Sequence, residues 1–419
     1  MAPKILVISP IPTHPQNAGN RTGTYILVNM LKSLGCEVHF LCLSNYSIDS
    51  NVKTGPNFRL MKKKWDKVYI LKKKKIKDYL GALLYLSYYL LGLVGKIMKG
   101  YVPKAYHFLK PSFPTIKVEN KYLKGVDSLY PAELDRFVKD SCDVNSYNIV
   151  IAEYIFMSRA LELFPDKVLK VIDTNDIFTD RSKKVKNSWF SVSREEEARG
   201  LNRADLVIAV QDDDAEYFRE IVHKRVRVVT VGRSLEAKRP PRNSRPGRCL
   251  LFVGSHNEPN TYAINFFTKE VLPIVRREAP KICLLIAGYV CRSVRRGKGY
   301  RKLGEISNID KAYDSASIVV APVFNGTGLK IKVVEALGHG KVVVATSHAA
   351  IGLEKLTRLR NSPLLIANTP KEFASQIKSA LHDGNYDKRV ENAYAFIKDY
   401  NKDIEKNVRK ILEYAKKKS

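Results

Sequence analysis

Short apolar runs alternate with longer amphipathic segments along almost the whole chain. The first runs predict strands at 4–9, 37–43, 67–71, 148–153, 169–173, 206–210 and 226–231. A helix is expected between the first two runs, from about Gly23 to Leu34, with Gly35 as its stop signal. Continuous apolar strands separated by helices are typical of a parallel sheet that is covered on both faces.

This alternation is interrupted at 233–248, a segment rich in proline and arginine without apolar periodicity, which indicates a linker. Beyond it, strands are predicted at 249–253, 282–287, 318–321, 342–346 and 364–366. Helices are predicted at 261–278 with Asn260 as N-cap, at 309–316, 329–337 and 371–382, and in the basic tail from Asp387. The pattern therefore predicts an α/β protein with Rossmann-like domains at 1–232 and 249–395, a linker at 233–248 and a C-terminal helix at 396–419.

Composition narrows the class of protein. The 419 residues are 45% hydrophobic and 27% charged, which excludes a disordered, collagenous or multi-span membrane chain. The net charge of +30 predicts an anionic partner: nucleic acid, an acidic membrane or a phosphorylated substrate. Six cysteines without a C-x-x-C pair predict neither a disulfide framework nor structural zinc, and fit a reducing compartment. The run Ile5–Ile8 is too short for a signal peptide.

The positive charge is concentrated before an apolar stretch. Lysines 62–64 and 72–75 precede seventeen uncharged residues, 79–95. As a helix these would span about 26 Å, less than the roughly 30 Å of a hydrocarbon core. The stretch is therefore a buried helix of the N-terminal domain, a helix seated at the membrane surface, or a transmembrane helix. We expect peripheral association with the anionic, cytoplasmic face of a membrane.

The segment 322–340 is the part of the sequence that most clearly indicates a binding site. Gly326 and Gly328 follow a predicted strand and precede a helix, an arrangement that presents backbone N–H groups to an anion. Lys330 and Lys332 lie at the start of that helix, where a cation is unfavourable unless an anion binds. Glu335 follows one turn later and suits the hydroxyls of a ribose. The alternative is a surface helix with an ion pair between positions three apart.

These residues carry a resemblance to a known family. The stretch 326–346, followed by 350–353, resembles the donor-binding signature of GT-B glycosyltransferases of the family 4 type, the glycosyl transferases of group 1. The stretches 251–254 and 304–306 resemble other elements of that family's C-terminal domain, and 19–21 and 203–208 are similar to its N-terminal domain.

The resemblance implies two Rossmann-like domains facing across a cleft, with the C-terminal helix returning to the N-terminal domain. It implies a nucleotide-sugar bound on the C-terminal domain, transfer that retains configuration, and no metal ion. Glu335 would hold the ribose, and Gly19 and Asn20 would bring backbone donors to the diphosphate. Ser255 and His256 would contact the phosphate or nucleoside.

Two departures from the family pattern shift the expected roles. Many relatives have a glutamate eight residues before the second one, where this chain has Thr327, which would bind a sugar hydroxyl without charge. Many also have an arginine and a lysine after the position of Gly254, which are absent here. The pattern of Gly328, Lys332 and Glu335 therefore predicts Lys332 as the residue that meets the leaving diphosphate. Lys330 is the second candidate.

Acidic residues that follow strands of the N-terminal domain are candidates for the acceptor side. Asp176 lies after the strand at 169–173 and would orient the acceptor hydroxyl, or else form an Asx turn that caps the next helix. Glu153, at the end of another strand, is a second candidate. Loop histidines 14, 339 and 348 are expected to be solvated, and the glutamates at 195–197 are expected to form a solvated helix face.

The sequence thus predicts a glycosyltransferase that moves a sugar from a UDP- or GDP-linked donor to a hydroxyl of a glycan or lipid-linked acceptor. It would act in cell-surface polysaccharide or glycolipid synthesis, with no cofactor beyond its co-substrate. The alternative is a non-catalytic GT-B module that binds a glycan or a protein. Nucleic acid is not an expected partner, because the basic residues follow no aromatic platform or recognition helix.

Overall fold

The computed structural model describes residues 2–16, 18–44, 55–72, 125–184, 188–238, 247–306, 309–326, 330–382 and 384–418. Met1–Leu71 and Lys124–Ser419 form one compact unit. The apolar stretch 79–95 lies outside the described residues, so its three interpretations stay open. In the described part of the chain, no helix is both long and apolar enough to cross a membrane.

Seven of the described strands form a first sheet in the order β3-β2-β1-β4-β5-β6-β7. Their bounds are β1 Lys4–Ser9, β2 Glu37–Ser44, β3 Lys67–Lys72, β4 Ile149–Glu153, β5 Leu169–Asp173, β6 Leu206–Ala209 and β7 Arg227–Thr230. Each predicted strand agrees with these bounds within one residue at either end. The strands from β2 through β1 and β4 to β7 pair in parallel, as the continuous apolar runs predicted.

Six further strands form a second, parallel sheet in the order β10-β9-β8-β11-β12-β13 among the described residues. They are β8 Cys249–Val253, β9 Cys283–Ala287, β10 Tyr300–Gly304, β11 Ile318–Ala321, β12 Val342–Ala345 and β13 Leu364–Ile366. The strand β10 was not predicted from the sequence. This edge strand keeps two of its basic residues, Arg301 and Lys302, exposed, so it has no apolar run.

Helices cover both sheets. Beside the first sheet lie α1 Gly19–Ser33, α2 Phe58–Lys64, α4 Leu134–Ser141, α5 Arg181–Lys184, α6 Arg194–Leu201 and α7 Asp212–Ile221. The part of the chain with the second sheet has α8 Glu258–Phe266, α9 Leu272–Glu278, α10 Asp310–Asp314, α11 Ile331–Gly338, α12 Glu354–Thr357 and α13 Pro370–His382. The last helix is α14 Tyr386–Lys418. It begins one residue before Asp387, from which the basic tail was predicted to be helical.

Three predicted helix starts were wrong. The helix α1 begins at Gly19 rather than near Gly23, although Gly35 ends it with a φ of 88° as expected. The N-cap of α8 is Asn257, not Asn260, and its side chain accepts a hydrogen bond from the Asn260 N–H at 2.9 Å. A π-helical turn at Phe267–Val271 then separates α8 from α9. The helix α11 begins at Ile331, two residues later than predicted.

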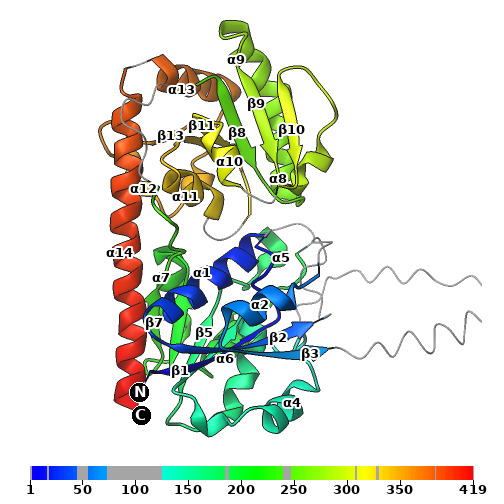
Figure 1. Cartoon of the computed structure of the whole chain (residues 1–419), viewed down its shortest axis with the longest axis vertical. Coiled ribbons are helices and arrows are strands. Elements are labelled where there is room, and N and C mark those ends of the chain that lie inside the picture. The colour runs from blue at the N-terminus through cyan, green and yellow to red at the C-terminus, as the bar shows by residue number, and fades with distance from the viewer. Residues whose placement is uncertain are drawn as a thin grey trace, which may run out of the picture. The chain divides into compact units, whose positions relative to one another are not determined.

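The C-terminal helix α14 joins the cores of both sheets (Figure 1). Its first half contributes Val390, Ala393 and Ile397 to the apolar core around the second sheet. Its second half contributes residues such as Ile404 and Val408 to the core on one face of the first sheet. The C-terminal helix therefore returns to the N-terminal sheet, as expected.

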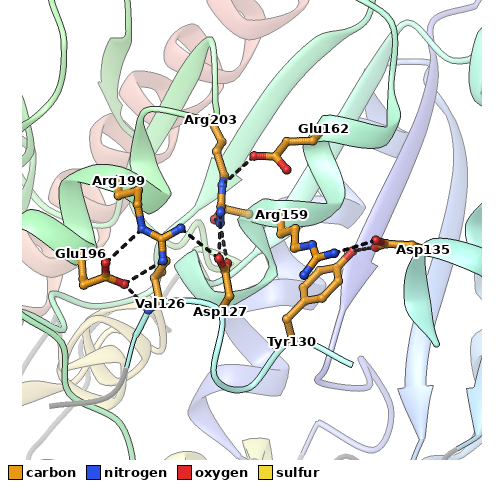
Figure 2. Close-up of polar contacts among 10 residues, drawn as sticks. Val126, Asp127, Tyr130, Asp135, Arg159, Glu162, Glu196, Arg199 and Arg203 are labelled. Atoms are coloured by element: carbon orange, nitrogen blue, oxygen red, sulfur yellow. Dashed lines mark hydrogen bonds and ion pairs between the residues drawn. The ribbon is translucent and has the colours of Figure 1, made fainter. Parts of the chain in front are cut away.

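An ion-pair network holds the described segment that begins at Gly125 against α6 (Figure 2). Asp127 pairs with both Arg199 and Arg203, and Glu196 accepts the Val126 N–H at 2.7 Å. The expectation of a solvated face at 195–197 therefore holds for Glu195, which is exposed, but not for Glu196 and Glu197. Glu197 is fully buried, and its carboxylate accepts hydrogen bonds from two backbone N–H groups, at 178 and 179, and from the hydroxyl of Thr179.

Candidate functional site

Each sheet reverses its strand order at one point, between β1 and β4 in the first and between β8 and β11 in the second. Ligands of open parallel sheets bind outside the carboxyl ends of the strands at such points. The chain after β1 leads to Gly19 and Asn20, the loop after β8 carries Ser255 and His256, and the loop after β11 carries Gly326. The predicted donor residues thus follow strands at the two switch points. Thr327 and Gly328 lie outside the described residues.

The N-terminal ends of α1 and α11 face each other. A Cβ atom on Gly19, the first residue of α1, would lie 3.9 Å from Cδ1 of Ile331, the first residue of α11. Neither helix has an acidic residue in its first turn or a capping hydrogen bond from its N-cap side chain. Two positive helix-dipole ends therefore converge on one place, an arrangement that stabilises an anion.

Glu335 lies on α11 beside these helix ends, with 12% of its side chain exposed. Its Oε2 accepts hydrogen bonds from the Tyr313 hydroxyl at 2.8 Å and from Lys332 Nζ at 2.7 Å. The Tyr313 ring is fully buried and stacks on His339 at 4.2 Å between centroids. Tyr313 therefore fixes the orientation of the carboxylate. His339 is half-buried in this stack rather than solvated as expected.

A cavity of about 490 Å³ opens next to Glu335. It is lined by residues of α1, including Thr22, Tyr25 and Asn29, and on its other side by Glu335 and His339. This volume is in the range of sites for small molecules and cofactors. The Glu335 carboxylate therefore reaches a space that can hold part of a nucleotide.

The two lysines of the glycine loop have different surroundings. Lys330 precedes α11 as its N-cap, and its Nζ donates to the Gly326 carbonyl at 3.3 Å. Burial lowers the pKa of Lys330, whereas the carboxylates of Asp176 and Asp214 act to raise it. Lys332 has 40% of its side chain exposed and pairs with Glu335. Lys330 is thus the lysine that lies near acidic groups of the first sheet's loops and helices.

The Gly326 loop is held by a histidine that was not predicted to act. The Gly326 carbonyl hydrogen-bonds with Nε2 of His348 at 2.8 Å, in addition to its bond from Lys330. A φ of 107° at Gly326 requires glycine there. His348 is therefore a loop anchor rather than a solvated residue. His14 also differs from expectation, because its ring packs edge-on against Tyr25 at 5.3 Å.

The first turn of α8 lies against the Gly326 loop. A Cβ atom on Gly326 would lie 3.7 Å from Cγ of Pro259. The Ser255 carbonyl and hydroxyl both accept hydrogen bonds from Asn260 Nδ2, at 3.1 and 3.2 Å. His256 is exposed on the same loop. The loop with Ser255 and His256 is therefore bonded to the start of α8, where Pro259 contacts the glycine loop.

Glu153 belongs to a buried cluster at the carboxyl edge of the first sheet. Its Oε2 accepts hydrogen bonds from Thr24 and from Asn175. Arg233 Nη2 donates to both carboxylate oxygens of the neighbouring Asp173, at 3.0 and 2.9 Å. Burial raises the pKa of Glu153 well above its usual value, and the Asp173 carboxylate raises it further. Glu153 is fully buried, so this carboxyl group is shielded from solvent in the structure.

Asp176 lies at the same edge and is less buried. Its Oδ2 pairs with Arg181 at 3.0 Å, and its Oδ1 accepts a hydrogen bond from the N–H of the next residue at 3.1 Å. The carboxylate also acts electrostatically on Lys330. Asp176 is therefore the acidic candidate that lies near the glycine loop. The proximity depends on tertiary packing, which the sequence spacing did not reveal.

Comparison with solved structures defines the class of fold. HepE of Anabaena, solved with UDP and glucose, superposes over 99% of both chains with a TM-score of 0.58 at 15% identity. A mutant TarM of S. aureus, solved with Fondaparinux, alpha-GlcNAc-glycerol and UDP, superposes over 98% of both chains with a TM-score of 0.59 at 11% identity. The chain has the GT-B fold, two parallel sheets of the kind found in glycosyltransferases.

Sequence comparison gives a more specific likeness over the second sheet. Residues 247–383 match the family model described as glycosyl transferases group 1. An uncharacterized 44.6 kDa protein in the cps region of Klebsiella pneumoniae is 30% identical over 170 residues. That match covers 36% of this chain and 42% of the relative, so the chain spans less than half the length of the curated protein it matches.

Proposed function

We propose that this chain is a glycosyltransferase that moves a sugar from a UDP- or GDP-linked donor to a hydroxyl of a glycan or lipid-linked acceptor. The observation that carries the proposal is the Glu335 carboxylate, held by Tyr313 beside two converging helix N-termini and at the wall of a cavity. A ribose on Glu335 would direct the attached diphosphate toward those helix ends. Solved neighbours with the same fold contain UDP.

In this proposal the N–H groups of α1 and α11 and a lysine stabilise the charge that grows on the departing diphosphate. Preorganised donors are most effective for such a task. Lys330 is favoured for this role because it precedes α11 and lies near Asp176, where the acceptor hydroxyl would approach. Lys332, which was the first candidate from the sequence, would instead hold Glu335 in place. The departing phosphate takes the acceptor proton, configuration is retained, and no metal ion takes part.

The proposal also covers the pathway, the domain limits and the position of the protein at the membrane. The likeness to a protein of a cps region favours cell-surface polysaccharide synthesis. The domain limits 1–232 and 249–395 belong to it, with Gly19, Asn20, Ser255, His256, Thr327 and Gly328 on the donor side and Asp176 and Glu153 on the acceptor side. A peripheral position on the cytoplasmic membrane face is supported by α2, where Arg59, Leu60, Lys62 and Lys63 are all exposed.

A panel of UDP- and GDP-sugars, screened by thermal shift and then by transfer to oligosaccharide acceptors, tests the proposal. With the donor identified, Lys330→Ala should lower kcat about 10²–10³-fold, the scale of one preorganised donor. Lys332→Ala and Glu335→Gln should chiefly raise the KM for the donor, because the ribose does not change charge during transfer. Collapse of kcat in Lys332→Ala alone would exchange the roles of the two lysines.

Two results would replace the proposal. Donor binding without transfer or donor hydrolysis would favour a non-catalytic module that binds a glycan or a protein. Near-normal kinetics in all three variants would remove the case for this loop as the donor site. Membrane association is tested separately with vesicles: Lys62→Gln with Lys63→Gln should weaken binding to phosphatidylglycerol vesicles, and equal binding to neutral vesicles would contradict a charge mechanism.

A further inference from the structure

Five aromatic rings gather where the chain leaves the carboxyl end of β4. Their centroids lie 5.1–6.4 Å from their neighbours in the cluster, which consists of Tyr154, Phe156, Phe178, Trp189 and Phe190. Four of the five residues are buried, whereas Trp189 is 38% exposed. We call this cluster the aromatic platform. The donor site does not use it.

The exposed indole is held in a fixed orientation. The rings of Phe156 and Phe178 meet it edge-on, each at 5.7 Å, and Phe190 stacks on it at 5.8 Å. Backbone hydrogen bonds between the segments around Phe178 and Val192 fix the chain on either side, with the Asp180 N–H bonded to the Val192 carbonyl at 3.0 Å. Little entropy is therefore lost when a ligand covers this ring.

The backbone of the platform is strained. Tyr154 has φ 69° and ψ 149°, a region that is close to exclusive to glycine and costs about 1–3 kcal/mol for other residues. The Tyr154 N–H donates to the Asp173 carbonyl at 2.8 Å, and its ring stacks on Phe156 at 5.1 Å. Such strain is concentrated at functional sites. Here the strained residue, Tyr154, directly follows Glu153, and its backbone conformation points its ring toward the other rings of the platform.

Contacts connect the platform to the proposed reacting groups. The Arg181 guanidinium lies 5.3 Å from the centroid of Phe178 and pairs with Asp176 at 3.0 Å. Asp176 in turn acts electrostatically on Lys330. The platform is thus beside the acidic residue that we propose for the acceptor side.

We propose that Trp189 is a stacking platform for a sugar ring of the acceptor glycan, an inference that rests on the proposed function. The apolar C–H face of a pyranose would cover the indole while its hydroxyls remain in water or bond to polar neighbours. The rim of the platform is charged: Asp180 and Lys183 form a partly exposed ion pair at 3.0 Å, next to Arg181. A lipid chain on the same ring would desolvate these charges, which is costly, so the rim favours a sugar.

The chain offers a direct optical test, because it contains two tryptophans. Trp65 is 3% exposed, and its indole N–H donates to Thr13 at 2.9 Å. In a Trp65→Phe background Trp189 is therefore the only indole. Titration with cellohexaose, maltohexaose and chitohexaose should give, with at least one of them, a saturable blue shift and less quenching by acrylamide. Calorimetry should show that Trp189→Ala abolishes this binding and that Trp189→Phe keeps part of it.

Transfer kinetics provide the second readout. Trp189→Ala should raise the KM for the acceptor about 3- to 10-fold, the scale of one aromatic contact, while the KM for the donor and donor hydrolysis stay at wild-type values. Leu359→Ala is the matched control, because it removes another exposed apolar side chain, 47% exposed and far along the chain. Its acceptor KM should not change.

The outcomes separate this inference from the proposed function. Saturable sugar binding at Trp189 without transfer from any donor would refute the transferase and leave the platform standing. Transfer with an unchanged acceptor KM in Trp189→Ala, or no indole response to any of the oligosaccharides, would overturn the platform. A blue shift with phosphatidylglycerol vesicles and none with sugars would also overturn it and make Trp189 a membrane contact.

Discussion

Replacing Arg233 by methionine should strongly destabilise the protein. Arg233 and Asp173 are 1% and 0% exposed, and Arg233 Nη2 also donates to Asn175 at 2.8 Å. Without the guanidinium, the Asp173 carboxylate and the neighbouring Glu153 remain buried with no cation among their described partners. Breaking such a buried pair costs about 3–5 kcal/mol.

Thermal unfolding followed by circular dichroism measures this loss. One kcal/mol lowers the Tm by about 2–4 °C for domains of about 150–250 residues, so Arg233→Met should lower it by about 6–20 °C. The matched control is Arg409→Met, the same substitution in an exposed i,i+4 pair with Glu405. Pairs of that kind contribute about 0.3–0.5 kcal/mol, so the control should shift the Tm by less than about 2 °C.

A second variant tests the cause. Adding Asp173→Asn to Arg233→Met removes the unpaired charge, and it should therefore restore part of the lost Tm. Equal shifts for Arg233→Met and Arg409→Met would refute the reasoning. A double variant that is no more stable than Arg233→Met would show that packing rather than charge accounts for the loss.

Three further predictions follow from buried groups. The pKa of Glu153 is raised in the folded state, so from about pH 4.5 upward the unfolded chain releases a proton that the folded chain keeps, and wild-type stability falls by up to about 1.4 kcal/mol per pH unit. The Tm of Glu153→Gln relative to wild type should therefore rise between pH 5 and 8, and parallel profiles would contradict this. Glu197→Ala leaves a buried and a partly buried backbone N–H group and a hydroxyl without their acceptor. It should therefore lower the free energy of unfolding in urea by about 2–3 kcal/mol, and an unchanged midpoint would count against that role. Tyr313→Phe removes one hydrogen bond to Glu335 and should raise the donor KM about 5- to 10-fold with little change in kcat; a fall in kcat alone would argue against a role in orienting the ribose.

The strands were predictable because most of them are buried on both faces. In β1 the side chains of Leu6 and Ile8 enter one core and those of Ile5 and Val7 enter the other, so the whole run must be apolar. The edge strand β10 escapes this constraint because its basic side chains remain exposed. The start of α8 was misplaced because Asn257 and Asn260 are both good N-caps, and the choice depends on Pro259 in the first turn.

The site was predictable only where a motif is local. The glycine loop and Glu335 lie within one strand–loop–helix unit, so their spacing carries the information. Tyr313 is 22 residues from the carboxylate it orients, and the two residues belong to different helices, α10 and α11. Arg233 opens a segment whose composition indicates a linker, yet it is almost fully buried. A residue whose partners come from other elements leaves no such pattern in the sequence.

The start of α11 decides how two similar lysines differ. A helix from Leu329 would place Lys330 and Lys332 about 200° apart on one cylinder. Instead, Lys330 has φ −81° and ψ 81° as the N-cap, so its side chain turns back to Gly326 while Lys332, in the first turn, reaches Glu335. The two ammonium groups therefore have different charges around them: carboxylates from other elements act on Lys330, and the carboxylate of its own helix pairs with Lys332. A lysine tied to the ribose carboxylate would affect binding of the donor, whereas a lysine at the converging helix ends would meet charge that develops only as the bond breaks. This difference is why the two alanine variants should separate in KM and kcat.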